Sequence, residues 1–131
     1  MGRFGKIYWI LDDFSYIGTR TFNNDESLHI AAKIDNIIIE DYMIKFTVLP
    51  HKIPSGEISY NVNLNINSTE TLFEGHFSQI LDSSLGGEVR CELFKNRNNY
   101  FLYGKWIEDD YIYTWWSIIE KNNGFGPLNN L

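Results

Sequence analysis

The sequence is poor in the residues that cross-link small proteins or anchor them in membranes. Its 131 residues include a single cysteine, Cys91, so the chain cannot form an internal disulfide. Uninterrupted apolar runs such as residues 37–39 are far shorter than the ~20 residues of a membrane-spanning helix. Residues 1–13 lack the basic start, apolar run and cleavage site of a secretory signal. We therefore expect a cytoplasmic protein with one domain over residues 1–131, because a chain of this length buries roughly two-thirds of its unfolded surface.

Basic residues are also scarce. Eleven Lys and Arg face seventeen Asp and Glu, which gives a net charge of −6. The basic residues that the sequence scatters singly include Lys6, Arg20, Lys33, Lys45, Lys52 and Arg90. This balance opposes attraction to phosphate backbones and anionic lipid. We expect no nucleic-acid or membrane partner, and a basic protein suits the surface better.

Motifs that carry chemistry are missing as well. The three histidines lie far apart, and the sequence has no His-Glu-x-x-His, Cys-x-x-Cys, Gly-x-Ser-x-Gly or phosphate-binding glycine motif. Glu74 and Glu88 could meet across neighbouring strands, but alternation places both on a solvated face. We expect that the protein is not an enzyme and that it needs no metal or cofactor.

What the sequence does contain is apolar residues at every second position. Residues 57–67 alternate without a break, with Tyr60, Val62 and Leu64 among the residues on one face and Glu or Asn on most of the other. Residues 88–95 alternate in the same way, and residues 69–80 place Gly75 between two phenylalanines, which predicts a close backbone approach. No stretch has the 3.6-residue period of a helix. The pattern predicts β-strands throughout.

Two similar stretches lie near opposite ends of the chain: residues 9–16 (WILDDFSY) and residues 106–113 (WIEDDYIY). Each predicts an aromatic strand, an Asp-Asp turn and a second aromatic strand. Asp35 and Asn36 predict a further two-residue hairpin turn. The apolar phase then changes, so we expect a bulge or a second turn around residues 40–42.

Other segments predict loops, namely residues 49–56, residues 81–87 and a loose tail at residues 121–131. The sequence therefore predicts an all-β, single-domain antiparallel meander of 8–10 strands in a closed or partly open barrel. A two-sheet sandwich is the alternative.

The last third of the chain carries a pattern of Phe101-x-x-Gly104-x-Trp106-x-x-Asp109-x-Tyr111-x-Tyr113-x-Trp115. It resembles the final hairpin of calycin-type barrels, the architecture of lipocalins and fatty-acid-binding proteins. The chain departs from lipocalins at its first strand, where Gly5 and Trp9 are four apart and no Gly-x-Trp is present. The resemblance implies an up-and-down barrel whose interior could hold an apolar ligand.

The C-terminal hairpin is apolar on both faces, unlike a barrel strand with one wet face. Phe101, Tyr103 and Ile107 oppose the face that carries Leu102 and Trp106. Either another part of the chain covers the second face, or a ligand or partner does.

Two functions remain. The composition is similar in style to bacterial immunity proteins, cytoplasmic inhibitors that neutralise a basic toxin such as a nuclease. For this function the predicted partner-binding residues are Asp12, Asp13, Glu108, Asp109, Asp110, Tyr111 and Trp116.

The alternative is a carrier of a small apolar ligand. Its predicted cavity lining is Tyr60, Phe73, Phe77 and Trp106. We favour the inhibitor because large inward aromatics tend to fill a small barrel.

Overall fold

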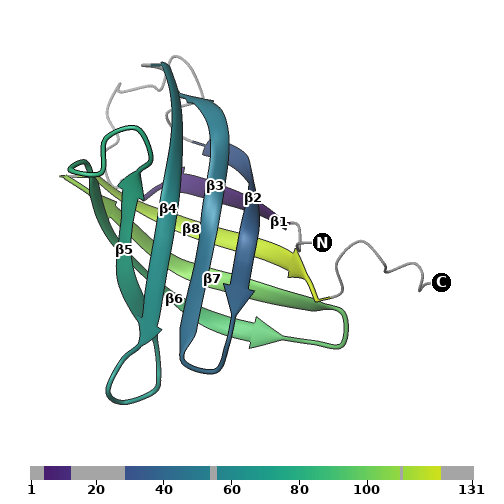
Figure 1. Cartoon of the computed structure of the whole chain (residues 1–131). Coiled ribbons are helices and arrows are strands. Elements are labelled where there is room, and N and C mark those ends of the chain that lie inside the picture. The colour runs from purple at the N-terminus through teal and green to yellow at the C-terminus, as the bar shows by residue number, and fades with distance from the viewer. Residues whose placement is uncertain (1–4, 13–28, 54–55, 110, 122–131) are drawn as a thin grey trace, which may run out of the picture.

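The computed structural model describes residues 5–12, 29–53, 56–109 and 111–121, and within them the chain forms one closed β-barrel (Figure 1). The eight strands of these residues are β1 (Gly5–Leu11), β2 (His29–Ile39), β3 (Met43–Ile53), β4 (Gly56–Ile66), β5 (Phe73–Gln79), β6 (Gly86–Lys95), β7 (Asn99–Glu108) and β8 (Tyr111–Glu120).

Each strand pairs antiparallel with the next, and β8 returns to pair with β1. The predicted all-β meander is confirmed, and the closed ring of pairing excludes the two-sheet sandwich. No helix in the described ranges is long and apolar enough to cross a membrane. Residues 122–131 of the predicted tail lie outside the described residues.

Alternation along the strands separates a filled interior from the outside. On β4, Tyr60, Val62 and Leu64 are buried, whereas Asn61 and Asn63 between them are exposed. The same rule places Trp106 and Trp115 fully inside the barrel. The predicted faces of residues 57–67 and 88–95 are confirmed.

The predicted turn at Asp35 and Asn36 is wrong. β2 continues through both residues to Ile39, and its register with β3 shifts between Asp35 and Ile38. Asn36 does adopt a positive φ of 53°, but it does so within a β-bulge. The turn from β2 to β3 follows at residues 40–42, where the amide of Glu40 donates to the carbonyl of Met43.

The predicted loop at residues 49–56 is also wrong at residues 49–53 and 56, which belong to β3 and β4. Residues 54 and 55 lie outside the described residues. β3 extends to Ile53 and absorbs Pro50 at a second register shift, between Val48 and His51. A bulge tolerates proline because it leaves an amide outside the ladder. As a result His51 belongs to the barrel wall.

The structure contains the predicted C-terminal hairpin and part of the strand predicted for residues 69–80. Residues 106–113 form the predicted β7–β8 hairpin, with Asp109 at a φ of 54° in its turn. The second half of the hairpin predicted for residues 9–16 lies outside the described residues. The strand predicted for residues 69–80 is shorter, because residues 67–72 form a turn in which the Asn67 side chain accepts the Thr71 amide.

Gly75 makes the predicted close approach. A Cβ there would lie 1.9 Å from the carbonyl oxygen of Asn63 on β4. Gly104 is equally tight, with 1.9 Å to the carbonyl oxygen of Arg90. Gly104 pairs in register with Trp115 on β8. The Trp115 indole donates its N–H to the carbonyls of Arg90 and Lys105, both at 3.1 Å.

Candidate functional site

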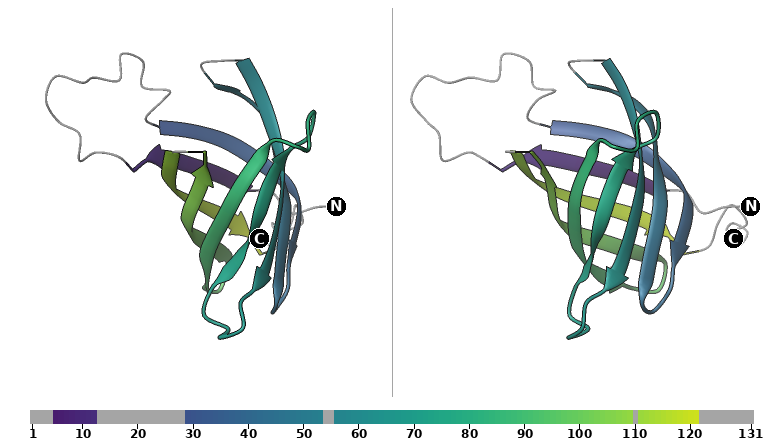
Figure 2. Two further views of the ribbon diagram at one scale, coloured as in Figure 1. Left: turned by 90° about the vertical axis from the view of Figure 1, so that its left-hand side faces the viewer. Right: turned by 60° about the vertical axis from the view of Figure 1, so that its left-hand side comes forward.

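The outer surface of β6, β7, β8 and β1 carries a continuous set of large apolar side chains, and these strands lie side by side on one wall of the barrel (Figure 2). The register pairs Phe94 with Phe101, and Phe101 with Ile118. One step along the strands, Trp116 pairs with both Tyr103 and Tyr8. We call these residues the apolar outer face: Tyr8, Phe94, Phe101, Tyr103, Trp116 and Ile118.

Much of this face is open to solvent. Phe94, Tyr103 and Ile118 are each exposed by nearly half, at 49%, 46% and 49%. The Tyr8 and Trp116 rings stack with centroids 5.5 Å apart. Side chains so arranged present a ring-rich apolar surface, the kind that anchors protein interfaces.

The opposite side of the barrel is polar. The exposed side chains of β4 include Asn61, Asn63 and Asn65, and β5 adds Glu74 and His76 beside them. The exterior therefore has two unlike sides, although the interior is mostly apolar.

A polar cluster borders the apolar outer face. Lys105 Nζ lies 2.8 Å from Asp12 Oδ2, and the Thr114 hydroxyl donates to Asp12 Oδ1. Burial opposes ionisation of Asp12, but the hydrogen bonds from Lys105 and Thr114 prevail and lower its pKa. This predicted partner-binding carboxylate is thus already paired within the chain.

The structure brings part of the predicted acidic site together. Asp12 lies beside the start of β8, because its amide donates to the carbonyl of Ile112 at 2.9 Å. Asp109 and Tyr111 are exposed in and next to the β7–β8 turn at the same end of the barrel. Asp13 and Asp110 lie outside the described residues. We call the described residues of this site, Asp12, Glu108, Asp109 and Tyr111, the acidic rim.

Trp116 does not belong to the acidic rim. It lies five residues along β8 from Tyr111, roughly 17 Å away at the rise of a β-strand. Its place is in the apolar outer face.

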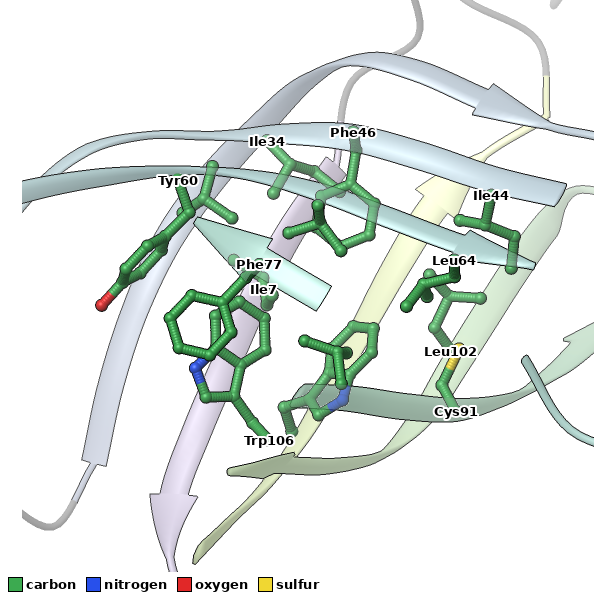
Figure 3. Close-up of a cluster of buried hydrophobic side chains, with 14 of the residues drawn as sticks. Ile7, Ile34, Ile44, Phe46, Tyr60, Leu64, Phe77, Cys91, Leu102 and Trp106 are labelled. Atoms are coloured by element: carbon green, nitrogen blue, oxygen red, sulfur yellow. The ribbon is translucent and has the colours of Figure 1, made fainter. Parts of the chain in front are cut away.

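The four residues predicted to line a carrier cavity lie in the core. Tyr60, Phe77 and Trp106 gather at one side of the buried cluster (Figure 3). Phe77 stacks on Trp106 with centroids 4.4 Å apart, and Tyr60 lies 5.0 Å from Phe77. Phe73 is buried as well. Rings in mutual contact at these distances fill the space between them.

Polar groups gather where this core approaches the acidic rim. Glu108 follows Trp106 by two residues on β7, so its side chain lies on the inward side. Burial, with the neighbouring charge of Asp109, raises the pKa of Glu108. Burial also raises the pKa values of Tyr60 and Tyr113, and the Glu108 carboxylate adds to both effects.

His51 completes this group. Its ring stacks on Trp9 at 5.3 Å, and its Nδ1 lies 3.0 Å from the carbonyl oxygen of Leu49. Burial lowers the pKa of His51, against the effects of the Leu49 carbonyl and Glu57. The folded barrel therefore favours the neutral ring.

A shallow groove crosses the polar side between β5 and β6. Glu74, His76, Glu88 and Arg90 line it. Glu74 pairs in register with Arg90, and Glu88 pairs with His76, so the two glutamates do not face each other directly. A cluster of three or more His, Cys, Asp or Glu suited to a metal is absent from the described part of the chain.

No family model matches this chain. A search of curated proteins also found no match. Among solved structures, the chain is similar to a redesigned β-barrel with a TM-score of 0.53, over 92% of this chain and 90% of that chain, at 6% sequence identity. A likeness at that identity shows the fold alone.

Sequence reasoning missed Tyr8 and Phe94 as members of the apolar outer face. Their signal was available in the alternation, since Tyr8 stands between the inward Ile7 and Trp9, and Phe94 follows the inward series Val89, Cys91 and Leu93 by one residue. It missed His51 as a neighbour of Trp9 and Tyr60 because residues 49–56 predicted a loop. Only the bulge at Pro50 carries His51 back into the wall.

Proposed function

We propose that this protein is a protein-binding inhibitor of the immunity type, which neutralises a basic protein such as a nuclease by covering its active surface. The observation that carries the proposal is the apolar outer face. Phe94, Tyr103 and Ile118 stand half-exposed on one wall, whereas the opposite wall carries asparagines. An apolar, ring-rich patch with a charged border is typical of a protein interface.

Charge favours a basic partner. The chain carries a net charge of −6, and the exposed Asp109 lies on the same strand pair as the apolar outer face. Carboxylates at an interface margin accelerate association with a cation-rich protein, while the aromatic residues hold the complex. Asp12 contributes less in this proposal, because Lys105 already pairs with it.

The carrier is the weaker candidate. Its predicted lining residues contact one another across the interior, as the 4.4 Å stacking of Phe77 on Trp106 illustrates. An apolar ligand at the centre would have to displace these rings.

Affinity capture from extracts of the native host tests the proposal. We compare the unmodified protein with a Tyr103→Ser/Ile118→Ser variant, and with an Asn61→Ser/Asn63→Ser variant as the matched control on the polar side. The unmodified protein and the control should retain one basic protein that the outer-face variant loses. The purified partner should lose its activity at equal stoichiometry. Equal capture by all three proteins, or a partner that stays fully active, would refute the proposal.

A further inference from the structure

The charges around the apolar outer face have opposite signs at its two ends. Where β1 begins and β8 ends, the wall carries a group of basic residues (Figure 1), which we call the basic end: Lys6, Lys95, Arg97 and Lys121. The first three are exposed, and Lys121 donates from its Nζ to the carbonyl of Asn96 at 3.0 Å. Glu120 is an acidic residue beside them, so the net charge of this end is positive.

The opposite end of the same wall is acidic. It carries the acidic rim, in which Glu108 and Asp109 have no ion-pair partner among the described residues. Lys105 and Arg90 approach this end, but they lie 2.8 Å and 3.8 Å from carboxylates of their own chain. Excess negative charge is therefore left at this end of the apolar outer face.

The register pair of Tyr103 and Trp116 lies midway between the two ends. Along β8 and the residue that follows it, Trp116 is five residues from Tyr111 and five from Lys121. On β7, Tyr103 is five residues from Glu108. Each end is thus roughly 17 Å from this pair at the rise of a β-strand. A two-fold axis through the pair, perpendicular to the wall, would place the basic end of one copy opposite the acidic rim of another.

A second copy of the chain is the occupant that matches both ends of the face. A basic protein is attracted to the acidic rim alone, whereas two copies related by a two-fold axis make the same favourable contact twice. Four strands about 4.8 Å apart and up to ten residues long offer roughly 600 Å² on each copy. A standard-size interface buries about 800 Å² on each side. The contact therefore suits a weak dimer that dissociates on dilution.

We propose that the apolar outer face packs on the same face of a second copy in a two-fold dimer, with the basic end of each copy against the acidic rim of the other. Tyr103 and Trp116 lie at the axis, and the surrounding rings are buried between the two walls. The dimer does not rest on the proposed inhibitor function, although it uses the same face. A protein partner would have to displace the second copy.

Sedimentation velocity of the purified protein between about 1 μM and about 1 mM tests the dimer without any partner. The sedimentation coefficient should rise with concentration from that of a monomer to that of a dimer. Contacts between oppositely charged ends predict that raising the salt concentration from about 50 mM to about 500 mM weakens association about ten-fold. An apolar contact alone would strengthen with salt, because each copy carries a net charge of −6.

Charge reversal locates the contact. Lys6→Glu/Arg97→Glu reverses two exposed residues of the basic end. Lys45→Glu/Lys52→Glu, at exposed positions on β3, makes the same change of net charge away from the apolar outer face and is the matched control. The dimer of the basic-end variant should be about ten-fold weaker than that of the control. Circular dichroism checks that both variants keep the barrel.

Tyr103→Ser/Ile118→Ser should remain monomeric over the same concentration range. Three results would overturn the proposal: an unmodified protein that is monomeric at about 1 mM, equal association of the basic-end variant and its control, or association that salt fails to weaken. A monomeric protein that still binds a protein partner would contradict the dimer alone. A dimer without a protein partner would contradict only the proposed inhibitor.

Discussion

Single residues in this barrel take their roles from the strand position that holds them. Ser117 is a polar residue buried among the core side chains, and its hydroxyl donates to the carbonyl of Lys6 at 2.6 Å. Asp12 illustrates the same rule at the surface, because its position beside β8 puts it within reach of Lys105 and Thr114. Sequence reasoning found the acidic residue and could not find its partners, which are 93 and 102 residues away along the chain.

Asp12 and Asp109 should therefore respond differently to neutralisation. We expect Asp12→Asn to lower the free energy of unfolding at pH 7 by about 1 kcal/mol, since it removes the ion pair with Lys105. Asp109→Asn should change it by no more than a few tenths of a kcal/mol, because asparagine tolerates the left-handed turn position. Urea unfolding measures both.

The stability difference between the unmodified protein and Asp12→Asn should depend on pH. The pKa of Asp12 is lowered from 3.8, so its contribution is present above that value and is lost as pH falls through the lower folded-state pKa. The difference between the unmodified protein and Asp12→Asn should thus close in acid. A difference that persists unchanged at low pH would contradict the assignment.

His51 should make the barrel sensitive to mild acid. Its pKa is lowered from 6.5 by burial, so the unfolded chain takes up the proton first as pH falls. Stability from the neutral ring is complete above about pH 6.5 and declines below it. We expect the unfolding midpoint to fall between pH 7.5 and 5.5, and His51→Gln to flatten this slope. His76→Gln, at an exposed position on β5, serves as the control and should keep the original slope.

At the scale of elements, alternation predicted the strands well and their irregularities poorly. In residues 57–67 the apolar residues stand at every second position, so only one face of the strand can point inward, and β4 occupies nearly that range. Asp35 and Asn36 have the sequence of a turn, but a bulge also needs a residue that tolerates positive φ. Pairing with β3 on both sides of Asn36 decides between them, and that pairing depends on distant residues.

The bulge gives a test at this scale. Asn36→Gly should be tolerated, because glycine adopts a φ of 53° without strain. Asn36→Val should lower the free energy of unfolding by about 1–2 kcal/mol, since left-handed backbone is costly for a β-branched residue. Urea midpoints of the two variants measure the difference. Equal midpoints would mean that the bulge is not formed in solution.

The whole molecule is a filled barrel with two unlike sides. Sequence reasoning anticipated a closed or partly open barrel and the doubly apolar C-terminal hairpin, and the pairing of β1 with β8 shows that the barrel is closed. It could not place Tyr8 beside Trp116, because the closing pair of β1 with β8 joins residues from opposite ends of the chain. The apolar outer face exists only once that pairing closes the ring.

A filled interior predicts poor binding of lipids. We expect the purified protein to show no saturable binding of a fluorescent fatty acid, because the inward rings of Phe77, Trp106 and Tyr60 already contact one another. Fluorescence titration measures this. Tight stoichiometric binding with quenching of tryptophan would favour the carrier.

The most direct measurement of the central claim is hydrogen–deuterium exchange of the protein with and without its purified partner. The account predicts that the partner slows exchange in β7 and β8, residues 99–120, and leaves β4 and β5 unchanged. The same experiment with the Tyr103→Ser/Ile118→Ser variant should show no protection. Protection confined to β4 and β5 would place the partner on the polar side and contradict the proposed interface.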